Sequence, residues 1–277
     1  MTNRLNEILV VSDVDGTLLQ AGFGIPRNNI DTIERFSALG GNFTFASGRG
    51  ITSAGKYTDI ISLSAPAILV NGGIIYDYAK RKILYESTLD PSVRIILKEI
   101  MEVFPYIGVE VLSRENIAAI RMNNEIHNHT AVEHLAVTLT GTDTVGDGWN
   151  KVLFADTPEN IGLLKNYVEK QRKRDSRYGK FAFVQTSNIY YELIPPRTNK
   201  ATGLVRLAEY MGIKMENTIA IGDFYNDLEL LNAAGLSVVV DDAPADIKKH
   251  ADMVVAPCLA GGVAELLNSL IDSCTAE

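Results

Sequence analysis

The chain has 277 residues, 46% of them hydrophobic and 22% charged, which is ordinary for a globular protein large enough for one or two domains. Its net charge of −8 argues against a protein that binds nucleic acid or an anionic membrane. No apolar run approaches the roughly 18 residues of a membrane span, and the first residues lack the apolar core of a signal peptide. Cys258 and Cys274 have no CxxC spacing, so we expect two free thiols in a cytoplasmic protein.

An apolar strand followed by two aspartates lies near the start of the chain. Residues 8–11 are apolar without alternation, which predicts a strand buried on both faces of a parallel sheet. Asp13, Asp15 and Gly16 follow, at the sheet edge where open α/β proteins bind ligands. The two carboxylates repel each other and are costly to bury, so we expect a bound divalent cation. The two positions after Gly16 lack the acid and the glycine of an EF-hand loop, and a plain Asp-Gly turn is the alternative.

From residue 26 to residue 73, helices and strands alternate. Pro26 begins a stretch with apolar residues at three-residue spacing, which predicts a helix that ends at Gly40-Gly41. We then expect a strand over 42–47, a helix to about residue 63, and a strand over 67–70 that closes on Asn71-Gly72-Gly73. Connections of helix length between strands predict a right-handed, parallel arrangement.

The middle of the chain has a different pattern, with many short strands and few helices. We expect an α+β domain with a mostly antiparallel sheet there. The predicted helices are 91–104 and 158–172, residues 138–150 are predicted as a loop, and the predicted strands are 83–86, 108–112, 117–121, 151–155, 181–185 and 190–193.

After residue 195 the alternation of helices and strands returns. The predicted helices are 200–211, 226–234, 244–250 and 261–273, and the predicted strands are 218–221, 236–240 and 253–255. We therefore predict a discontinuous α/β core domain over 1–79 and 196–277, with an inserted α+β domain over 80–195. The inserted domain carries 15 basic and 15 acidic residues, whereas the core carries 11 and 19, so the whole net charge of −8 lies in the core.

A second acidic cluster follows the strand predicted over 218–221. If Asn226 begins a helix, Asp223 lies at its entry and Asp227 one turn further, facing the same way. With Asp13 and Asp15 this gives up to four carboxylates at the ends of two strands, a set of hard oxygen ligands that suits Mg²⁺. The alternative is structural, with Asp223 as a helix N-cap and Asp227 interacting with the helix dipole.

Two further segments offer groups that could bind an anion. Ser47 and Gly48 lie between a strand and a helix, where backbone N–H groups suit a phosphate, although Ser-Gly is also ordinary turn chemistry. Lys200 begins a predicted helix, an unfavourable place for a cation, which hints at a role beyond the helix. The alternative for Lys200 is an exposed side chain lying over the helix.

These pieces resemble the four motifs of the haloacid dehalogenase (HAD) superfamily of phosphotransferases. The motifs are Asp13-Val14-Asp15-Gly16-Thr17, Ser47-Gly48-Arg49, Lys200 and Gly222-Asp223-x-x-Asn226-Asp227. The insertion resembles the type IIB cap of the Cof-like sugar-phosphatase branch. The resemblance implies a Rossmann-like parallel sheet core with helices on both faces. It also implies an Mg²⁺-dependent phosphatase that hydrolyses small phosphorylated metabolites, sugar phosphates above all, through an aspartyl phosphate.

The resemblance assigns a role to each motif residue. Asp13 is the nucleophile, and Asp15 is the general acid and then the general base. The Mg²⁺ set consists of Asp13, the Asp15 carbonyl, Asp223 and Asp227. The groups that contact the phosphate are Ser47, the Gly48 amide, Lys200 and Asn226.

Four other positions bear on substrate binding or metal affinity. Arg49 and Asn71 are candidates for contact with the substrate, against the alternatives of an exposed structural arginine and a simple tight turn. Asp241 and Asp242 stand where relatives often carry uncharged residues, and we hypothesise that their charge alters substrate choice or metal affinity.

Two other functions compete with a phosphatase. A phosphomutase of the phosphomannomutase type needs a second phosphate site, for which Arg114 and Arg121 are weak candidates because they are seven residues apart. A non-catalytic sensor of phosphorylated metabolites would not need both Asp13 and Asp15. The expected partner is a small phosphorylated metabolite, without nucleic acid or membrane, and the chain is expected to be a monomer or a homodimer.

Overall fold

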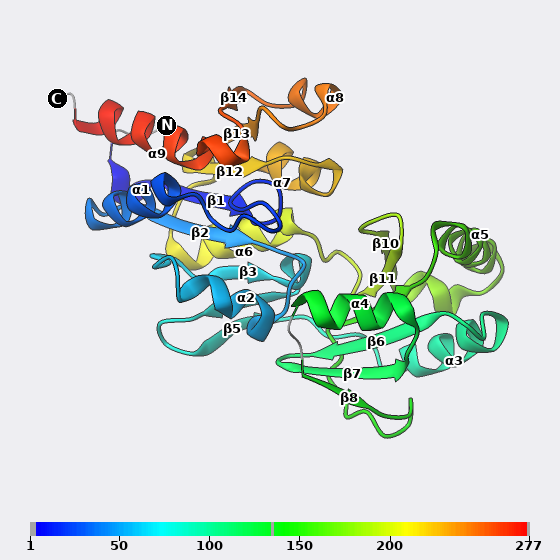
Figure 1. The fold of residues 1–277 in the computed structure, drawn as a ribbon. Coiled ribbons are helices and arrows are strands. Elements are labelled where there is room, and N and C mark those ends of the chain that lie inside the picture. The colour runs from blue at the N-terminus through cyan, green and yellow to red at the C-terminus, as the bar shows by residue number, and fades with distance from the viewer. Residues whose placement is uncertain (1–3, 134–135, 276–277) are drawn as a thin grey trace. The chain divides into compact units, whose positions relative to one another are not determined.

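The computed structural model of the protein describes residues 4–133 and 136–275 and divides into two compact units (Figure 1). The first, which we call the core, contains the residues up to 49, residues 54–85 and the residues from 199 onward. The second, which we call the inserted unit, contains residues 50–53 and 86–198. Each unit has its own sheet and its own cluster of buried apolar side chains.

The core contains a sheet in the order β14-β13-β12-β1-β2-β3-β4-β5 (Figure 1). The strands from β14 to β3 are parallel, as the sequence predicted, and β4 runs antiparallel to β3. Their bounds are β1 Leu9–Asp13, β2 Asn42–Ala46, β3 Ala67–Leu69, β4 Ile74–Asp77, β5 Lys82–Glu86, β12 Thr218–Gly222, β13 Leu236–Val240 and β14 Met253–Val255.

Helices cover both faces of this sheet. Leu9 and Val11 of β1 pack in one apolar cluster with residues of α6 and α7, and the alternation of a strand turns Val10 toward the other face. On that other face α1 packs against α9 (Figure 1). The bounds are α1 Arg27–Ala38, α2 Ile51–Thr58, α6 Lys200–Met211, α7 Leu228–Ala233, α8 Ala245–Lys248 and α9 Gly262–Thr275.

The structure differs from the sequence predictions at three places in the core. The helix expected to run to about residue 63 ends at Thr58. The helix expected from Asn226 begins as a 3₁₀ turn over Tyr225–Asp227, and α7 follows it. β5 is hydrogen-bonded next to β4 in the core sheet, beyond the predicted domain boundary at residue 79.

The inserted unit contains a second sheet, in the order β10-β11-β9-β6-β7-β8. Every pair is antiparallel except β7 and β8, which are parallel. The bounds are β6 Gly108–Ser113, β7 Asn116–Arg121, β8 Val137–Leu139, β9 Lys151–Ala155, β10 Ala182–Gln185, β11 Tyr190–Ile194, α3 Val93–Val103, α4 Asn124–Glu133 and α5 Pro158–Arg174. The sequence missed α4, and β8 overlaps the predicted loop over 138–150.

Alternation along these strands separates two apolar clusters. Val111 of β6 and Phe154 of β9 pack with α3 and α5, whereas Leu153 and Ala155 of β9 pack with Ile126 of α4. The inserted unit therefore carries helices on both faces of its sheet. No helix in the described ranges is both long and apolar enough to cross a membrane.

Candidate active site

The candidate site begins where β1 ends at the edge of the core sheet. Asp13 is the last residue of β1, which lies between β12 and β2, and the residue is 5% exposed. Gly16 has φ +94°, and a Cβ built on it would lie 2.4 Å from Asp223 Oδ2. Glycine is therefore required here both for the turn and for the close approach of the second acidic segment.

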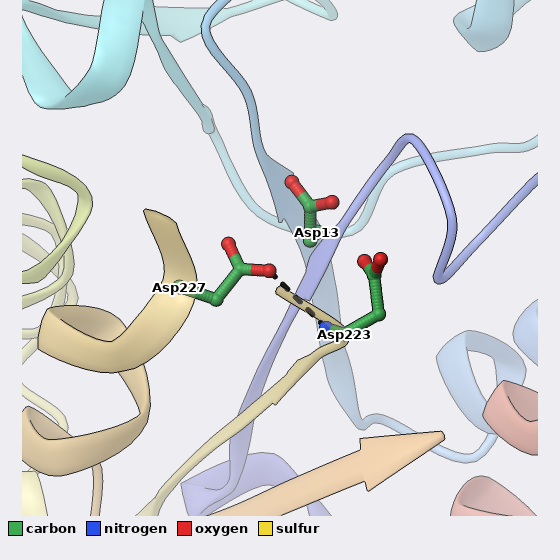
Figure 2. Close-up of side chains that lie close together, drawn as sticks. All are labelled: Asp13, Asp223 and Asp227. Carbon is green, nitrogen blue, oxygen red and sulfur yellow. Dashed lines mark hydrogen bonds between the residues drawn. The ribbon is translucent and has the colours of Figure 1, made fainter. Parts of the chain in front are cut away.

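The second acidic segment follows β12, the neighbouring parallel strand. One carboxylate oxygen from each of Asp13, Asp223 and Asp227 lies within 4.8 Å of the others. Figure 2 shows the three carboxyl groups projecting to the same side of the sheet edge. Asp227 Oδ2 accepts the backbone N–H of Asp223 at 3.2 Å and that of Phe224 at 3.3 Å, which fixes the segment around it (Figure 2). Three of the four acids predicted from the two strands thus lie close together.

Lys200 supplies the positive charge of this cluster. Its Nζ donates to Asp13 Oδ1 at 2.5 Å and to Asp227 Oδ1 at 2.6 Å, and its side chain is 3% exposed. Lys200 is the first residue of α6, whose N-cap Asn199 forms a capping box with Thr202. The buried ion pairs offset the unfavourable place of a lysine at a helix N-terminus.

Burial and like charge change the pKa values of the cluster. Burial raises the pKa of Asp13 well above its usual value, the nearby Asp227 charge raises it further, and Lys200 opposes both. The pKa of Asp223 rises to about 6, with burial again the largest cause and the hydrogen bond from Thr17 opposing it. Burial disfavours the charged form of Lys200, but Asp13 and Asp227 together raise its pKa. Three carboxylates around one lysine thus carry excess negative charge.

This donor set fits a divalent cation bound through oxygen. Lys200 and two backbone N–H groups occupy both oxygens of Asp227, so Asp227 is suited to orienting its neighbours. Among the described residues, Asp13 Oδ2 and Asp223 Oδ2 accept no hydrogen bond, and each offers an oxygen to a metal. Carboxylate oxygens are the ligands that Mg²⁺ prefers, and a cation would offset both the burial and the like charge that raise the pKa values of Asp13 and Asp223.

Asp15 does not join this group of carboxylates. Its Oδ1 accepts from Arg49 Nη2 at 2.8 Å, and its Oδ2 accepts from Arg49 Nε at 3.0 Å, a bidentate pair. The Arg49 guanidinium also lies 5.6 Å from the centre of the Tyr57 ring. The Asp15 side chain is half exposed and both of its carboxylate oxygens are bonded to Arg49, so its carbonyl oxygen is left as the candidate metal ligand.

The segments after β2 and β3 are tied to each other. Ser47 is 3% exposed, its carbonyl accepts the N–H of Asn71 at 2.9 Å, and its Oγ accepts the N–H of Arg49 at 3.2 Å. A Cβ built on Gly48 would lie 3.2 Å from the Asn71 side chain. Asn71 itself has φ +51°, in the left-handed region that asparagine tolerates better than most residues. Ser47, Gly48 and Asn71 therefore form one compact loop pair at this sheet edge.

A family profile described as haloacid dehalogenase-like hydrolase matches residues 10–267. The chain belongs to this family. A curated relative is the 5-amino-6-(5-phospho-D-ribitylamino)uracil phosphatase YitU of Bacillus subtilis (strain 168), 27% identical over 94% of this chain and 96% of the relative. Several relatives of this chain are named as phosphatases, so this HAD-like hydrolase is a hydrolase of phosphoric monoesters.

Solved structures share the fold of this HAD-like hydrolase. One is a haloacid dehalogenase-like hydrolase from Bacteroides thetaiotaomicron, with a TM-score of 0.85 and 24% identity over 95% of this chain and 99% of that one. Another is the HAD subclass IIB sugar phosphatase BT4131, with a TM-score of 0.79 and 19% identity over 95% of this chain and 98% of that one. The whole chain, including the inserted unit, therefore has the architecture that its motifs predicted.

Some residues of the site fall outside the sequence predictions. Thr17 Oγ1 donates to Asp223 Oδ1 at 2.7 Å and so links the two acidic segments of the HAD-like hydrolase. Asn199 determines where α6, and with it Lys200, begins. Conversely, the Asn226 side chain is exposed and makes no hydrogen bond within the described ranges, so no contact joins it to the cluster. The sequence feature that could have identified Thr17 is a hydroxyl-bearing residue directly after the Asp-Gly turn.

Proposed function

We propose that this HAD-like hydrolase is an Mg²⁺-dependent phosphatase that hydrolyses small phosphorylated metabolites through an aspartyl phosphate. The observation that carries the proposal is the buried cluster of Asp13, Asp223 and Asp227 around Lys200, with Asp15 two residues from Asp13. A purely structural cluster has no need for an excess of buried negative charge, because that charge is costly without a bound cation.

In the first step, an Asp13 carboxylate oxygen forms a bond to phosphorus, and the bond from phosphorus to the alcohol oxygen of the substrate breaks. Asp15 donates its proton to that departing oxygen. In the second step, Asp15 takes a proton from water, the water oxygen bonds to phosphorus, and the bond to Asp13 breaks, which releases inorganic phosphate. Two displacements of this kind replace one that is more difficult.

The other residues position these groups. Lys200 holds Asp13 in one orientation and adds positive charge beside the phosphoryl oxygens. Ser47, the Gly48 amide and Asn226 are the proposed further contacts of the phosphate, and Arg49 and Asn71 of the substrate. When bound, Mg²⁺ would be held by Asp13, Asp223 and the Asp15 carbonyl, with Asp227 behind them, and would neutralise charge on the transferring group.

Sugar phosphates are the proposed first substrate class. Two findings support this class: the fold is shared with a protein described as a sugar phosphatase, and the substrate in the name of YitU contains a phosphorylated ribityl chain. The cytoplasmic location and the monomer or homodimer state remain predictions from the sequence.

The contacts of two arginines weigh against the phosphomutase alternative. Arg114 Nη2 lies 3.0 Å from Glu86 Oε2, and Arg121 donates to the carbonyls of Met101 and Phe104. Each guanidinium is already bonded within the inserted unit, and the two do not form a paired site for a second phosphate.

The test is release of inorganic phosphate from a panel of sugar phosphates and other phosphorylated metabolites. The native chain is assayed with Mg²⁺ and with EDTA, beside Asp13→Asn and a matched control, Asp246→Asn, which changes an exposed aspartate of the core. We expect release that needs Mg²⁺, is lost in Asp13→Asn and persists in the control. A folded native chain with bound Mg²⁺ that releases phosphate from no substrate would contradict the proposal.

A further inference from the structure

The inserted unit contains a cavity of about 600 Å³ that the proposed phosphatase chemistry does not use. Strands β6, β7 and β8, which lie side by side in Figure 1, line it through Val111, Ser113, Ala118 and Thr138. Residues 144–148 and the segment around Glu86 complete the lining. Its volume lies within the range of roughly 300–1,000 Å³ that is typical of small-molecule sites.

The wall made by residues 144–148 is held in place from α3. Arg94 Nη2 donates to the carbonyls of Val145 at 2.7 Å and Gly146 at 3.0 Å, and its guanidinium lies 4.4 Å from the centre of the Trp149 ring. Trp149 Nε1 donates to the same Gly146 carbonyl at 2.5 Å. Loops without secondary structure are usually mobile, so this density of contacts marks a preformed wall.

The opposite wall is equally well fixed. Glu86 is paired with Arg114 through both carboxylate oxygens, at 3.1 and 3.0 Å from Arg114 Nε. The buried Asn150 side chain accepts the Arg114 N–H at 2.6 Å and donates to Glu86 Oε1 at 3.2 Å. These bonds orient Glu86 without a ligand, so a ligand would meet an acceptor that is already positioned.

The polar groups that line the cavity determine which ligands it suits. They include the hydroxyls of Ser113 and Thr138, which can donate and accept hydrogen bonds, and those of Thr140 and Thr144, which are hydrogen-bonded to each other at 2.5 Å. Arg114 is the cation among the lining residues, and it is paired with Glu86. Without an uncommitted cation, the cavity is poorly suited to a phosphate. Hydroxyl groups over small apolar side chains instead suit a neutral ligand with several hydroxyls.

We propose that this cavity binds a neutral, polyhydroxylated small molecule, either a sugar alcohol or an unphosphorylated monosaccharide. The site is separate from the acidic cluster of the core, and the proposal does not rest on the proposed phosphatase function. Serine and threonine hydroxyls recognise the ligand, Glu86 accepts from a ligand hydroxyl, and Ala118 contacts its carbon face.

The experiment uses the single tryptophan of the chain, Trp149, as a reporter, because it supports the wall that the ligand contacts. The full chain is titrated with ribitol, D-glucose and D-glucose 6-phosphate, followed by Trp149 fluorescence and by calorimetry. We expect a saturable response to ribitol or to D-glucose, and at least about tenfold weaker binding of the phosphate ester. The two neutral probes distinguish an open-chain polyol from a sugar ring.

Variants of the lining residues test whether the ligand binds in the cavity. Ala118→Leu fills the space and Thr140→Val removes one hydroxyl at constant volume, and each is expected to weaken binding by about tenfold or more. The matched control is Leu139→Ala, an exposed residue of β8 outside the lining, which is expected to bind as the native chain does. Thr140→Val keeps the test decisive if Ala118→Leu does not fold.

Asp13→Asn separates this proposal from the phosphatase. Binding that persists in Asp13→Asn supports a site in the inserted unit, whatever the activity assay shows. Loss of binding in that variant would place the ligand at the acidic cluster and overturn the proposal. Absence of a saturable signal for both neutral probes in both measurements, or unchanged affinity in both cavity variants, would also overturn it.

Discussion

The two units of the molecule bury charge in different ways. In the core, the carboxylates of Asp13 and Asp227 share one amine, that of Lys200, and Asp223 adds a third carboxylate beside them. In the inserted unit, a buried lysine and a buried glutamate form a matched pair. Lys151 Nζ lies 2.8 Å from Glu192 Oε1, and both side chains are less than a tenth exposed.

We interpret the matched pair of the inserted unit as structural and the excess charge of the core cluster as functional. A matched buried pair satisfies itself, although its net contribution to stability is small because both ions lose water. The core cluster cannot satisfy itself, and the pKa values of Asp13 and Asp223 are raised first by burial and then by the charge of the neighbouring Asp227. The imbalance is tolerated where a cation and a phosphoryl group are expected to bind.

The largest expected effect is on the matched pair of the inserted unit. Lys151→Met leaves Glu192 buried without its lysine, which we expect to lower the free energy of unfolding by about 3–5 kcal/mol. The double variant Lys151→Met/Glu192→Leu should recover most of that loss because neither charge remains. Urea unfolding followed by circular dichroism measures both. If Lys151→Met is as stable as the native chain, the burial of Glu192 does not depend on its pairing with Lys151.

The corresponding lysine of the core is expected to affect catalysis. Lys200→Met removes positive charge from the proposed site of phosphoryl transfer, and we expect kcat to fall by about 10²–10³-fold, the usual cost of losing one preorganised electrostatic group. Lys248→Met is the matched control, because Lys248 pairs with an acid outside the cluster. Steady-state phosphate release measures both variants, and a native kcat in Lys200→Met would remove this lysine from the mechanism.

The buried carboxyl group of Asp223 also predicts a dependence of stability on pH. The pKa of Asp223 is about 6 in the folded chain, above its ordinary value, so its contribution is fully present below pH 4 and is lost as pH rises through 6. Without metal, we therefore expect Asp223→Asn to be more stable than the native chain at pH 7. Each kcal/mol gained in the free energy of unfolding should raise the Tm by about 2–4 °C.

The same measurement repeated with Mg²⁺ provides the control. Mg²⁺ should raise the Tm of the native chain more at pH 7 than at pH 4, because the ionised carboxylates are its ligands. It should raise the Tm of Asp223→Asn less. Equal shifts in the two proteins would argue against Asp223 as a ligand.

The smallest expected effect concerns the acid at the end of β13. Lys248 Nζ lies 2.5 Å from Asp241 Oδ1, and the Asp241 side chain is more than half exposed. Asp241→Asn should therefore change stability by no more than about 0.5 kcal/mol and Mg²⁺ affinity by less than about threefold. Calorimetric titration of Mg²⁺ checks the second value, and a larger change would support the metal effect that we hypothesised from the sequence.

Much of the core fold could be predicted because its signals are local. The apolar run before Asp13 identifies a central parallel strand, and Lys200 and Gly212 mark both ends of α6, where Gly212 adopts φ +68°. The sequence could not assign β4 and β5 to the core sheet, because a short apolar run does not reveal which sheet it joins. Helix α4, Asn124–Glu133, was missed because it has few apolar residues at helical spacing.

The candidate site was predicted in part for a similar reason. Asp13, Asp223 and Asp227 were predicted as acids that follow two strands of one parallel sheet and from the resemblance to the HAD motifs, and in the structure their carboxylates lie close together. The bidentate pair of Asp15 with Arg49 depends on side-chain direction, which no spacing encodes. The exposed position of Asn226 follows from a 3₁₀ turn where the sequence predicted a regular helix.

The start of α6 also rests on a distant glycine. Gly72 has φ +91°, and a Cβ built on it would lie 2.0 Å from the carbonyl oxygen of Asn199, the residue before Lys200. Any side chain at position 72 must push this helix start away and carry the lysine amine with it. In a mutational scan scored by activity alone, Gly72 would therefore rank among the reacting residues although it has no chemistry of its own. Mutations that reduce activity are thus expected at Gly72, whose contribution is only the space that its missing side chain leaves for Asn199.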